Sequence, residues 1–289
     1  MELAFDGVDV FTADRFGGNP LAVVHGADGL GDALMRAVTR EFNWSETVFL
    51  CRPLDPRATA RLRIFTPGGE VPFAGHPLIG TGFVLARLPA HAGAPGFTVE
   101  TAAGPVALTI RRTGARVTEV RLTAPQPVAT GPDLDPADAA AALGLPRAEI
   151  VTTRHPPRHA SVGLPFLIVE LASRTALSRA AAVPAAFPGQ GAPSRMIWAY
   201  TRDLSPADGA VDLTARMFAP FDGVPEDPAT GSATAAACAM LAGLTGQADF
   251  AVAQGIDMGR PSRLTVTVDA AGVHLGGACV PVMAGTLRV

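Results

Sequence analysis

The sequence repeats itself in a way that predicts two similar halves. Three short segments of the first half recur in the second half in the same order, two of them at a spacing of 153 residues (218 minus 65) and one at 145 (163 minus 18). The recurring pairs are Gly18–Val24 with Gly163–Val169, Phe65-Thr-Pro and Val71-Pro72 with Phe218-Ala-Pro and Val224-Pro225, and Phe97-Thr-Val99 with Phe250-Ala-Val252. Such a series is typical of a duplicated unit of about 120–150 residues, which is a usual size for one domain. We therefore expect two similar domains that face one another across a cleft.

Charge and composition exclude two classes of function. The formal net charge of −3 over 289 residues gives no basic excess, and no run of Arg with interleaved aromatic residues is present to follow a phosphate backbone. Nucleic acid is therefore not expected as a partner. The 23 residues counted as Lys or Arg are all Arg, so the chain lacks the Lys that a pyridoxal phosphate enzyme uses to hold its cofactor as a Schiff base.

The sequence carries no sign of a membrane or disulfide-bonded protein. Its first residues lack a positive region followed by an apolar one, so no signal peptide is expected. The long uncharged stretch Pro228–Gln247 consists largely of small residues that insert poorly into a membrane, and it predicts a buried helix instead. Cys51, Cys238 and Cys279 show no paired spacing for disulfides or zinc. We expect a reduced, cytoplasmic protein with no membrane contact.

Each half is expected to place one helix inside its own sheet. In the first half, Pro77–Leu88 is apolar or small on nearly every face, which is typical of a buried helix, and Pro is favoured at the first helical position. In the second half, an Ala-rich helix from about Ser232 to Leu244 follows a strand, Asp212–Phe218, in the same order.

A Pro-rich stretch over residues 123–136 predicts a linker and places the domain boundary near residue 124. The first domain is expected at 1–124, and the second, a pseudo-repeat of the first, at 125–277. The final strand, about 278–289, needs a pairing partner, and the first domain is one candidate.

Two helix starts are candidate anion sites. Gly75–Pro77 opens the first central helix, and Thr230–Ser232 opens the second. The first turn of a helix has N–H groups without partners in the helix and the positive end of the dipole, so it favours a carboxylate. Gly75 and Gly231 lack a Cβ and would let a ligand oxygen approach the backbone. Gly and Ser also begin many helices, so the pattern alone leaves a structural role open.

Glu46 is the candidate residue for proton transfer. It lies where a predicted helix, Asp32–Phe42, gives way to a predicted strand, Thr47–Arg52, with Trp44 beside it. An apolar setting raises the pKa of a carboxyl group and prepares it to exchange protons near neutrality. The structural alternative is an ordinary surface Glu at the end of a helix.

Further polar residues adjoin the helix starts. His76 and Asp227 could donate or accept protons, and Ser232 could cap its helix or bind a substrate. A buried structural imidazole is the alternative for His76. Glu226 and Asp227 form an acidic pair, but no third or fourth ligand follows at a sensible spacing, so no metal is expected. No dinucleotide-binding or P-loop glycine pattern supports a nucleotide cofactor.

Together these segments resemble the phenazine biosynthesis PhzF-like proteins. The matching motifs occur in order over nearly the whole chain, and their combination is specific although each is short. They are Asp9–Val24, Asn43–Thr47, Phe65–Pro67 with Glu70–Pro77, Glu226–Ala233 and Gly259–Ser262.

The resemblance implies a diaminopimelate epimerase-like fold of the α/β (α+β) class, with two similar domains, each a curved mixed β-sheet wrapped around a central helix, and an active site between them. It also implies a homodimer and proton transfer without a cofactor. The best-understood activity of the family isomerises trans-2,3-dihydro-3-hydroxyanthranilate by moving a proton between ring carbons. A small carboxylate is therefore the expected substrate.

The resemblance also assigns roles to individual residues. Glu46 matches the catalytic acid/base of the family, and His76, Asp227 and Ser232 match its other active-site positions. The residues expected to bind the substrate are Asn19, Gly75, Thr230 and Gly231.

Two alternatives stay open. Amino-acid epimerases and racemases of the same fold use two cysteines, one at each helix start, where this chain has no thiol. Cys238 lies two turns into its predicted helix and is a poor substitute, so an epimerase would need Glu46 and another base. The second alternative is a non-catalytic protein that binds a small ligand.

Overall fold

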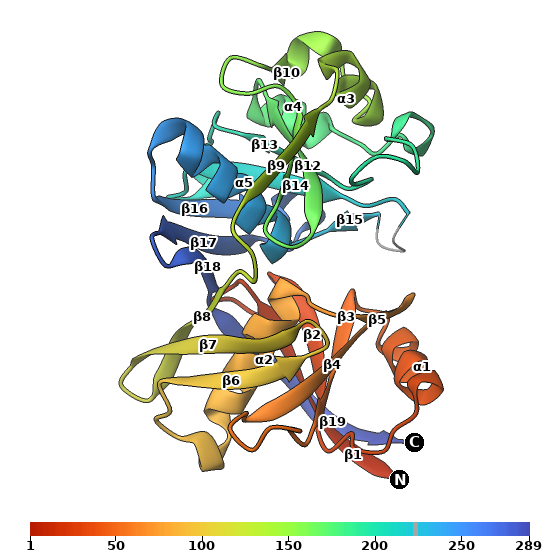
Figure 1. Ribbon diagram of the computed structural model, residues 1–289, viewed down its shortest axis with the longest axis vertical. Coiled ribbons are helices and arrows are strands. Elements are labelled where there is room, and N and C mark those ends of the chain that lie inside the picture. Colours follow the sequence, from red (N-terminus) through yellow and green to blue (C-terminus); the bar gives the residue numbers. More distant parts are fainter. Residues whose placement is uncertain (222–224) are drawn as a thin grey trace. The chain divides into compact units, whose positions relative to one another are not determined.

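The chain forms two compact units, shown in Figure 1. This computed structural model describes residues 1–221 and 225–289. Val224, which belongs to one of the recurring pairs, lies outside the described residues. The first unit comprises Met1–Thr123 and Gly276–Val289, and the second comprises Ala124–Leu275.

The first unit is built on a mixed sheet. Its strands pair in the order β19–β1–β2–β3–β4–β6–β7–β8, and β5 pairs with β4. The β2–β3 and β4–β6 pairs are parallel, and the other pairs are antiparallel. The strands are β1 (Glu2–Val10), β2 (Asn19–Val24), β3 (Glu46–Cys51), β4 (Ala60–Thr66), β5 (Gly69–Val71), β6 (Gly96–Thr101), β7 (Gly104–Thr113), β8 (Arg116–Thr123) and β19 (Cys279–Arg288).

Helix α2 (Gly75–Arg87) is the central helix of this unit. It packs against β1, β2, β3, β6, β7, β8 and β19, and every residue except Arg87 is buried. The strands approach so closely that a Cβ on Gly80 would lie 2.5 Å from the Leu21 side chain, and one on Gly82 would lie 2.8 Å from Val120. A helix that is apolar on every face is therefore enclosed, as its sequence predicts.

The second unit has its own mixed sheet, with strands in the order β9–β11–β12–β13–β14–β16–β17. The short strands β10 and β15 pair with β12 and β14. The strands are β9 (Ala129–Asp133), β10 (Ile150–Val151), β11 (Arg158–Ser161), β12 (Pro165–Leu171), β13 (Ile197–Thr201), β14 (Leu213–Phe218), β15 (Glu226–Asp227), β16 (Asp249–Gln254) and β17 (Ser262–Asp269), followed by β18 (Gly272–Gly277).

Helix α5 (Gly231–Thr245) is the counterpart of α2. It packs against β11, β12, β13 and β17, and its small Ala side chains are almost all buried. It ends at Gly246, whose φ of 76° is the left-handed conformation that favours Gly at this position. The other helices are α1 (Asp32–Phe42), α3 (Pro136–Ala142) and α4 (Arg174–Arg179), and none of the helices in residues 1–221 and 225–289 combines the length and apolarity needed to cross a membrane.

The recurring segments occupy corresponding places in the two sheets. The first two recurring segments lie in β2 and β12, and each of these strands has a parallel neighbour, β3 or β13. The second pair lies at the ends of β4 and β14, each of which pairs with a short strand, β5 or β15. The third lies in β6 and β16, which are parallel to β4 and β14 and antiparallel to β7 and β17. The repeat in the sequence is thus a repeat of strand order around a central helix.

The expected starts of the two elements that carry Glu46 and His76 were wrong. α2 begins at Gly75, so Pro77 is its third residue and not its first. The N–H that Pro lacks would have no partner at either position, so the Pro signal fixes the first turn but not its first residue. β3 begins at Glu46 and not at Thr47, because Glu46 already pairs with Leu21 of β2.

Candidate active site

Glu46 is positioned by a short turn between α1 and β3. The turn begins at Asn43, which has the left-handed φ of 53°, and Trp44 then stacks on Phe42 with a ring distance of 5.5 Å. Glu46 pairs with Leu21 as the first residue of β3. Its side chain is 17% exposed. The carboxylate is therefore held by regular structure and still reachable by a ligand.

His76 lies beside this carboxylate. Its Nδ1 is 3.5 Å from Glu46 Oε2, and its side chain is 4% exposed. Burial lowers the pKa of His76 to about 3, while a hydrogen bond with the backbone of Pro20 opposes this shift. The ring is therefore neutral at pH 7, and its approach to Glu46 is a polar contact and not an ion pair.

The hydrogen bonds of His76 indicate which ring nitrogen carries the proton. Pro20 has no N–H, so its carbonyl must accept the hydrogen bond from the ring. His76 Nε2 is buried and has no hydrogen-bond partner among the described residues. Because Nδ1 faces Glu46, we assign the ring proton to Nδ1 and the lone pair to Nε2.

The start of α2 supplies backbone donors next to this pair. Ala74 precedes the helix and provides no side-chain cap. The first N–H that closes the helix is that of Leu78, which bonds to the Ala74 carbonyl at 3.4 Å. The N–H groups of Gly75 and His76 precede it and so have no partner within the helix. An uncapped first turn with its positive dipole end favours an anion.

Asn19 joins the same group of residues. It is the first residue of β2, is fully buried, and accepts a hydrogen bond from the Ser45 hydroxyl at 3.0 Å. The preceding Gly18 has φ of 61°, and a Cβ there would lie 2.2 Å from the Val10 carbonyl oxygen. Asn19 is thus tied to the residue next to Glu46. The structure brings together the four predicted site residues of the first unit.

Two of the four predicted residues of the second unit, Asp227 and Thr230, belong to a buried polar cluster. The Thr230 hydroxyl donates to the Asp227 carboxylate. The Gln254 amide donates to the Asp227 carbonyl at 2.8 Å and to the Thr230 hydroxyl at 3.2 Å, and its oxygen accepts from the Thr230 N–H at 3.3 Å. Gln254 is fully buried and was not predicted. Its closure of the cluster fixes Asp227 and Thr230 to one another.

The start of α5 also lacks a side-chain cap, because the Thr230 hydroxyl is turned to Asp227. Gly231 and Ser232 open the helix, and the Ser232 side chain is half-buried. The loop before the helix is held by Ser262, whose hydroxyl bonds to the carbonyls of Pro228 and Arg260 at 3.1 and 3.0 Å. The first turn is thus a second candidate anion site within its own unit.

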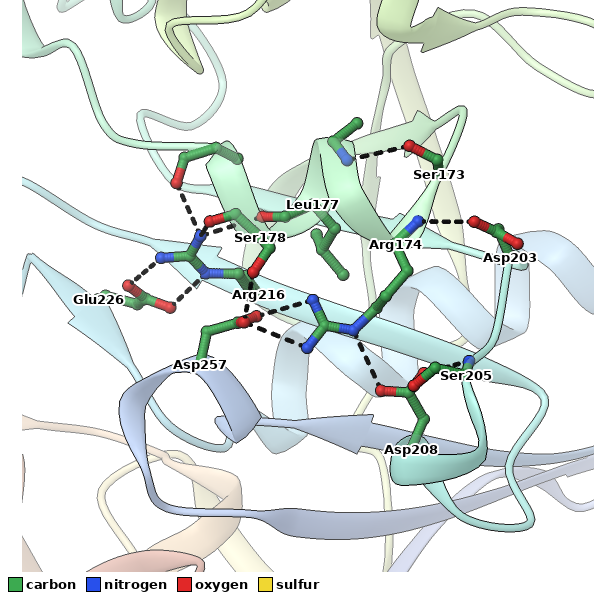
Figure 2. Close-up of polar contacts among 12 residues, drawn as sticks. Ser173, Arg174, Leu177, Ser178, Asp203, Ser205, Asp208, Arg216, Glu226 and Asp257 are labelled. Carbon is green, nitrogen blue, oxygen red and sulfur yellow. Dashed lines mark hydrogen bonds and ion pairs between the residues drawn. The ribbon is translucent and has the colours of Figure 1, made fainter.

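Asp227 is further fixed through its neighbour Glu226, whose contacts with Arg216 are drawn in Figure 2. Arg216 donates to both carboxylate oxygens of Glu226, at 2.8 and 2.7 Å. Its other terminal nitrogen donates to the carbonyls of Leu177, Ser178 and Ala180 at the end of α4, at 3.0, 3.1 and 2.7 Å. Asp227 and Glu226 form β15, so this arginine ties the strand that carries Asp227 to α4.

A neighbouring arginine completes the framework in Figure 2. Arg174 bonds to Asp208 at 3.1 Å and to Asp257 at 3.1 Å. Asp257 also accepts from Ser178 at 2.7 Å, the residue whose carbonyl binds Arg216. Loops from distant parts of the unit are thereby fixed around β15.

The cysteines are not placed for thiol chemistry. Cys51, Cys238 and Cys279 are all buried and free. Burial raises the pKa of each thiol, so the nucleophilic thiolate is disfavoured. None of them lies in the first turn of α2 or α5. In the part of the chain that the structure describes, no group of three or more His, Cys, Asp or Glu side chains is arranged to hold a metal ion.

Comparison with known proteins gives matches along nearly the whole chain. The model of a family described as phenazine biosynthesis-like protein, PhzC–PhzF, matches residues 8–285. A protein of Mesorhizobium japonicum named as an uncharacterized isomerase is 38% identical, over 97% of this chain and 97% of its own. The trans-2,3-dihydro-3-hydroxyanthranilate isomerase of Pseudomonas aeruginosa is 34% identical, over 92% of this chain and 90% of its own.

Solved structures confirm the predicted fold class. A PhzF-family phenazine biosynthesis protein of Bacillus anthracis superposes with a TM-score of 0.89 at 23% identity, over 100% of both chains. A predicted epimerase of Pseudomonas aeruginosa superposes with a TM-score of 0.82 at 34% identity, over 99% of both chains. With a family match over residues 8–285 and relatives named as isomerases at similar length, the chain belongs to the phenazine biosynthesis-like PhzC–PhzF family and is an isomerase.

Proposed function

We propose that the chain moves a proton between two carbons of a small carboxylate substrate without a cofactor, and that Glu46 carries the proton. The observation that supports this most is the pairing of Glu46 with a buried, neutral His76 at the uncapped start of α2. Glu46 is reachable by a ligand, and the imidazole of His76 beside it does not compete for the proton at neutral pH.

One carboxylate is sufficient for the proposed reaction. Ionised Glu46 removes a proton from an acidic C–H of the substrate, and the electron pair of that bond is delocalised into the adjacent unsaturated system. Glu46, now a carboxylic acid, returns the proton to a different carbon of that system. The enzyme and the substrate both end with their original charge, and neither oxidant nor reductant is required.

His76 acts in this proposal by position and not by titration. Its Nδ1–H dipole points toward Glu46 and Pro20, so it stabilises the ionised carboxylate and fixes its orientation. A group with a pKa near 3 would be a poor proton acceptor at pH 7. We therefore assign His76 as a positioning residue.

Substrate binding is proposed for the remaining predicted residues. Asn19 and Gly75 lie within the Glu46 group, and the first turn of α2 offers N–H donors to a carboxylate. Related enzymes named for trans-2,3-dihydro-3-hydroxyanthranilate act on a carboxylate, which supports this class of substrate. From the second unit we propose contributions of Asp227, Thr230, Gly231 and Ser232. A homodimer is part of the same proposal, and light scattering after size-exclusion chromatography tests it.

The test uses two Glu→Gln variants. Glu46→Gln keeps the shape of the side chain and removes its basicity, so it should fold normally and lose turnover of trans-2,3-dihydro-3-hydroxyanthranilate or of a related carboxylate by about 100-fold or more. Proton NMR in D2O should show exchange of the mobile carbon-bound proton with the unmodified chain and with the control variant, but not with Glu46→Gln. Glu41→Gln changes an exposed Glu of α1 and serves as the matched control. Full exchange by the Glu46→Gln variant would remove Glu46 from the reaction.

Stereoinversion is the second candidate, since a predicted epimerase is similar over the whole chain at 34% identity. Glu46 and a second base would then act on opposite faces of one carbon. Chiral chromatography of amino and hydroxy acids after incubation separates the two functions. An inverted stereocentre without migration of the proton to another carbon would favour the epimerase.

A further inference from the structure

The first unit contains a cavity of about 900 Å³ at the opposite end of α2 from Glu46. Its lining comes from the end of α2, the turn between β7 and β8, the loop after β1 and the start of β19. Gly75 and Arg87 are twelve residues apart on α2, which corresponds to about 18 Å along a helix. Arg87 and the α2 part of the lining are therefore well separated from Glu46, whereas Cys279 of the lining lies two strands from Asn19 in the sheet.

Four arginines line this cavity: Arg15, Arg87, Arg112 and Arg116. Among the described residues of the lining, Asp14 is the only acidic one, which gives an excess of three positive charges, whereas the whole chain has a net charge of −3. None of the four arginines forms an ion pair with a carboxylate among the described residues. Arg63 and Arg216, by contrast, are each paired with a glutamate.

Three of these side chains are held in place by contacts that leave donors unused. Arg15 uses its Nε to bond the Pro281 carbonyl at 2.9 Å. Arg112 bonds the Ala86 carbonyl at 2.9 Å and the Ala115 carbonyl at 3.4 Å, and its buried Nε has no hydrogen-bond partner among the described residues. The Arg87 guanidinium lies 5.3 Å from the centre of the Phe83 ring. Each guanidinium has five N–H donors, so oriented donors remain for a ligand.

We propose that this cavity is a second ligand-binding site, for a small organic molecule with at least two phosphate or carboxylate groups. Guanidinium groups bind both kinds of anion in a bidentate manner. One anionic group would not satisfy four cations that come from three separate segments. Half-buried Leu88, Val280 and Pro281 of the lining offer apolar surface for the body of the ligand. The volume lies in the range of small-molecule sites.

Isothermal titration of the full-length chain with pyrophosphate, citrate and inorganic phosphate tests this site. Pyrophosphate or citrate should bind saturably and weaken with added salt, and inorganic phosphate should bind at least about tenfold more weakly, because it reaches fewer arginines. If pyrophosphate binds and citrate does not, the ligand class is a phosphate. If both bind, the site accepts phosphate and carboxylate groups alike.

Exposed arginines provide matched variants. Arg87→Ala and Arg116→Ala should each weaken binding by about tenfold or more, the effect of losing one charge-assisted contact. Arg111→Ala removes an equal charge from the residue next to Arg112, but Arg111 pairs with Glu119 and does not line the cavity. It should leave binding unchanged.

Several results would overturn the site. One is the absence of saturable binding of pyrophosphate and citrate at concentrations up to about 10 mM, because a specific site should have a lower Kd than this. Equal weakening by Arg111→Ala would show only general charge attraction. Dissociation of an oligomer by Arg116→Glu, together with absent binding, would show that a second copy of the chain occupies this face.

Discussion

The Nδ1 of His76 lies 3.5 Å from Oε2 of Glu46, and the imidazole is neutral because burial lowers its pKa to about 3. A neutral ring next to a carboxylate has two possible uses: it orients the carboxylate through an N–H, or it exchanges a proton with it. Burial favours the first, because a buried cation would need stronger compensation than this contact provides.

Two substitutions of His76 distinguish these uses. His76→Asn places an amide N–H near the position of Nδ1 and cannot titrate, so we expect it to keep kcat within about tenfold of the original. His76→Leu removes the donor and leaves the Pro20 carbonyl without it, so kcat should fall by about 100-fold, equivalent to about 2.7 kcal/mol. KM should change little in either. An equal, large loss of kcat in both variants would instead assign a proton-transfer role to the ring.

The same burial predicts how stability depends on pH. The folded-state pKa of His76 lies below the unfolded value of 6.5, so the unfolded chain binds the additional proton at acidic pH. The contribution of His76 is fully present above pH 6.5 and is lost as pH falls toward 3, by up to about 1.4 kcal/mol per pH unit.

Urea unfolding at several pH values between 4 and 7 measures this term. The free energy of unfolding of the original chain should fall more steeply with acid than that of His76→Asn. His155, whose pKa is also lowered by burial, is present in both proteins and cancels in the comparison. Parallel pH profiles for the two proteins would contradict a depressed pKa at His76.

The sequence predicted the parts of this fold that depend on local pattern. α2 and α5 are apolar on every face, and a helix of that kind has to be enclosed by other elements. Glu46, Asn19 and Gly75 lie in short motifs near turns, where Gly, Pro and Asn fix the chain direction. The recurring segments gave the repeated strand order, because equivalent strands need equivalent apolar patterns.

The contacts that the sequence did not predict are long-range. Gln254 lies in β16 and Asp227 in β15, and they meet because both strands pair with β14. Arg216 binds α4 and Glu226 through a geometry that no local pattern contains. The neutrality of His76 depends on burial by the strands around α2. Such properties follow from which elements pack together, and a single sequence carries little information about that.

Arg216 should be among the most sensitive polar residues of the second unit. Its side chain is 11% exposed, and Arg216→Met would leave the Glu226 carboxylate and three carbonyls without their donor. We expect a loss of about 3–5 kcal/mol in the free energy of unfolding, as for other broken buried pairs. Chemical denaturation measures this loss.

Two controls accompany Arg216→Met. Arg179→Ala breaks the Arg179–Glu149 pair, in which the arginine is 55% exposed, and should cost no more than about 1 kcal/mol. Glu226→Gln keeps the shape of the pair and should cost less than Arg216→Met. If Arg179→Ala and Arg216→Met had similar costs, the framework in Figure 2 would not stabilise the unit.

The last prediction concerns the thiols. Cys238 and Cys279 are buried and the pKa of each is raised by burial, so a thiol reagent such as dithionitrobenzoate should react with the folded chain at least about 100-fold more slowly than with the chain in denaturant. Isomerase turnover should survive prolonged treatment with iodoacetamide, because the proposed proton carrier is Glu46. Rapid inactivation that follows modification of one cysteine would favour thiol-dependent stereoinversion. Turnover that resists iodoacetamide but is lost in Glu46→Gln would leave a carboxylate as the acid and base of this enzyme.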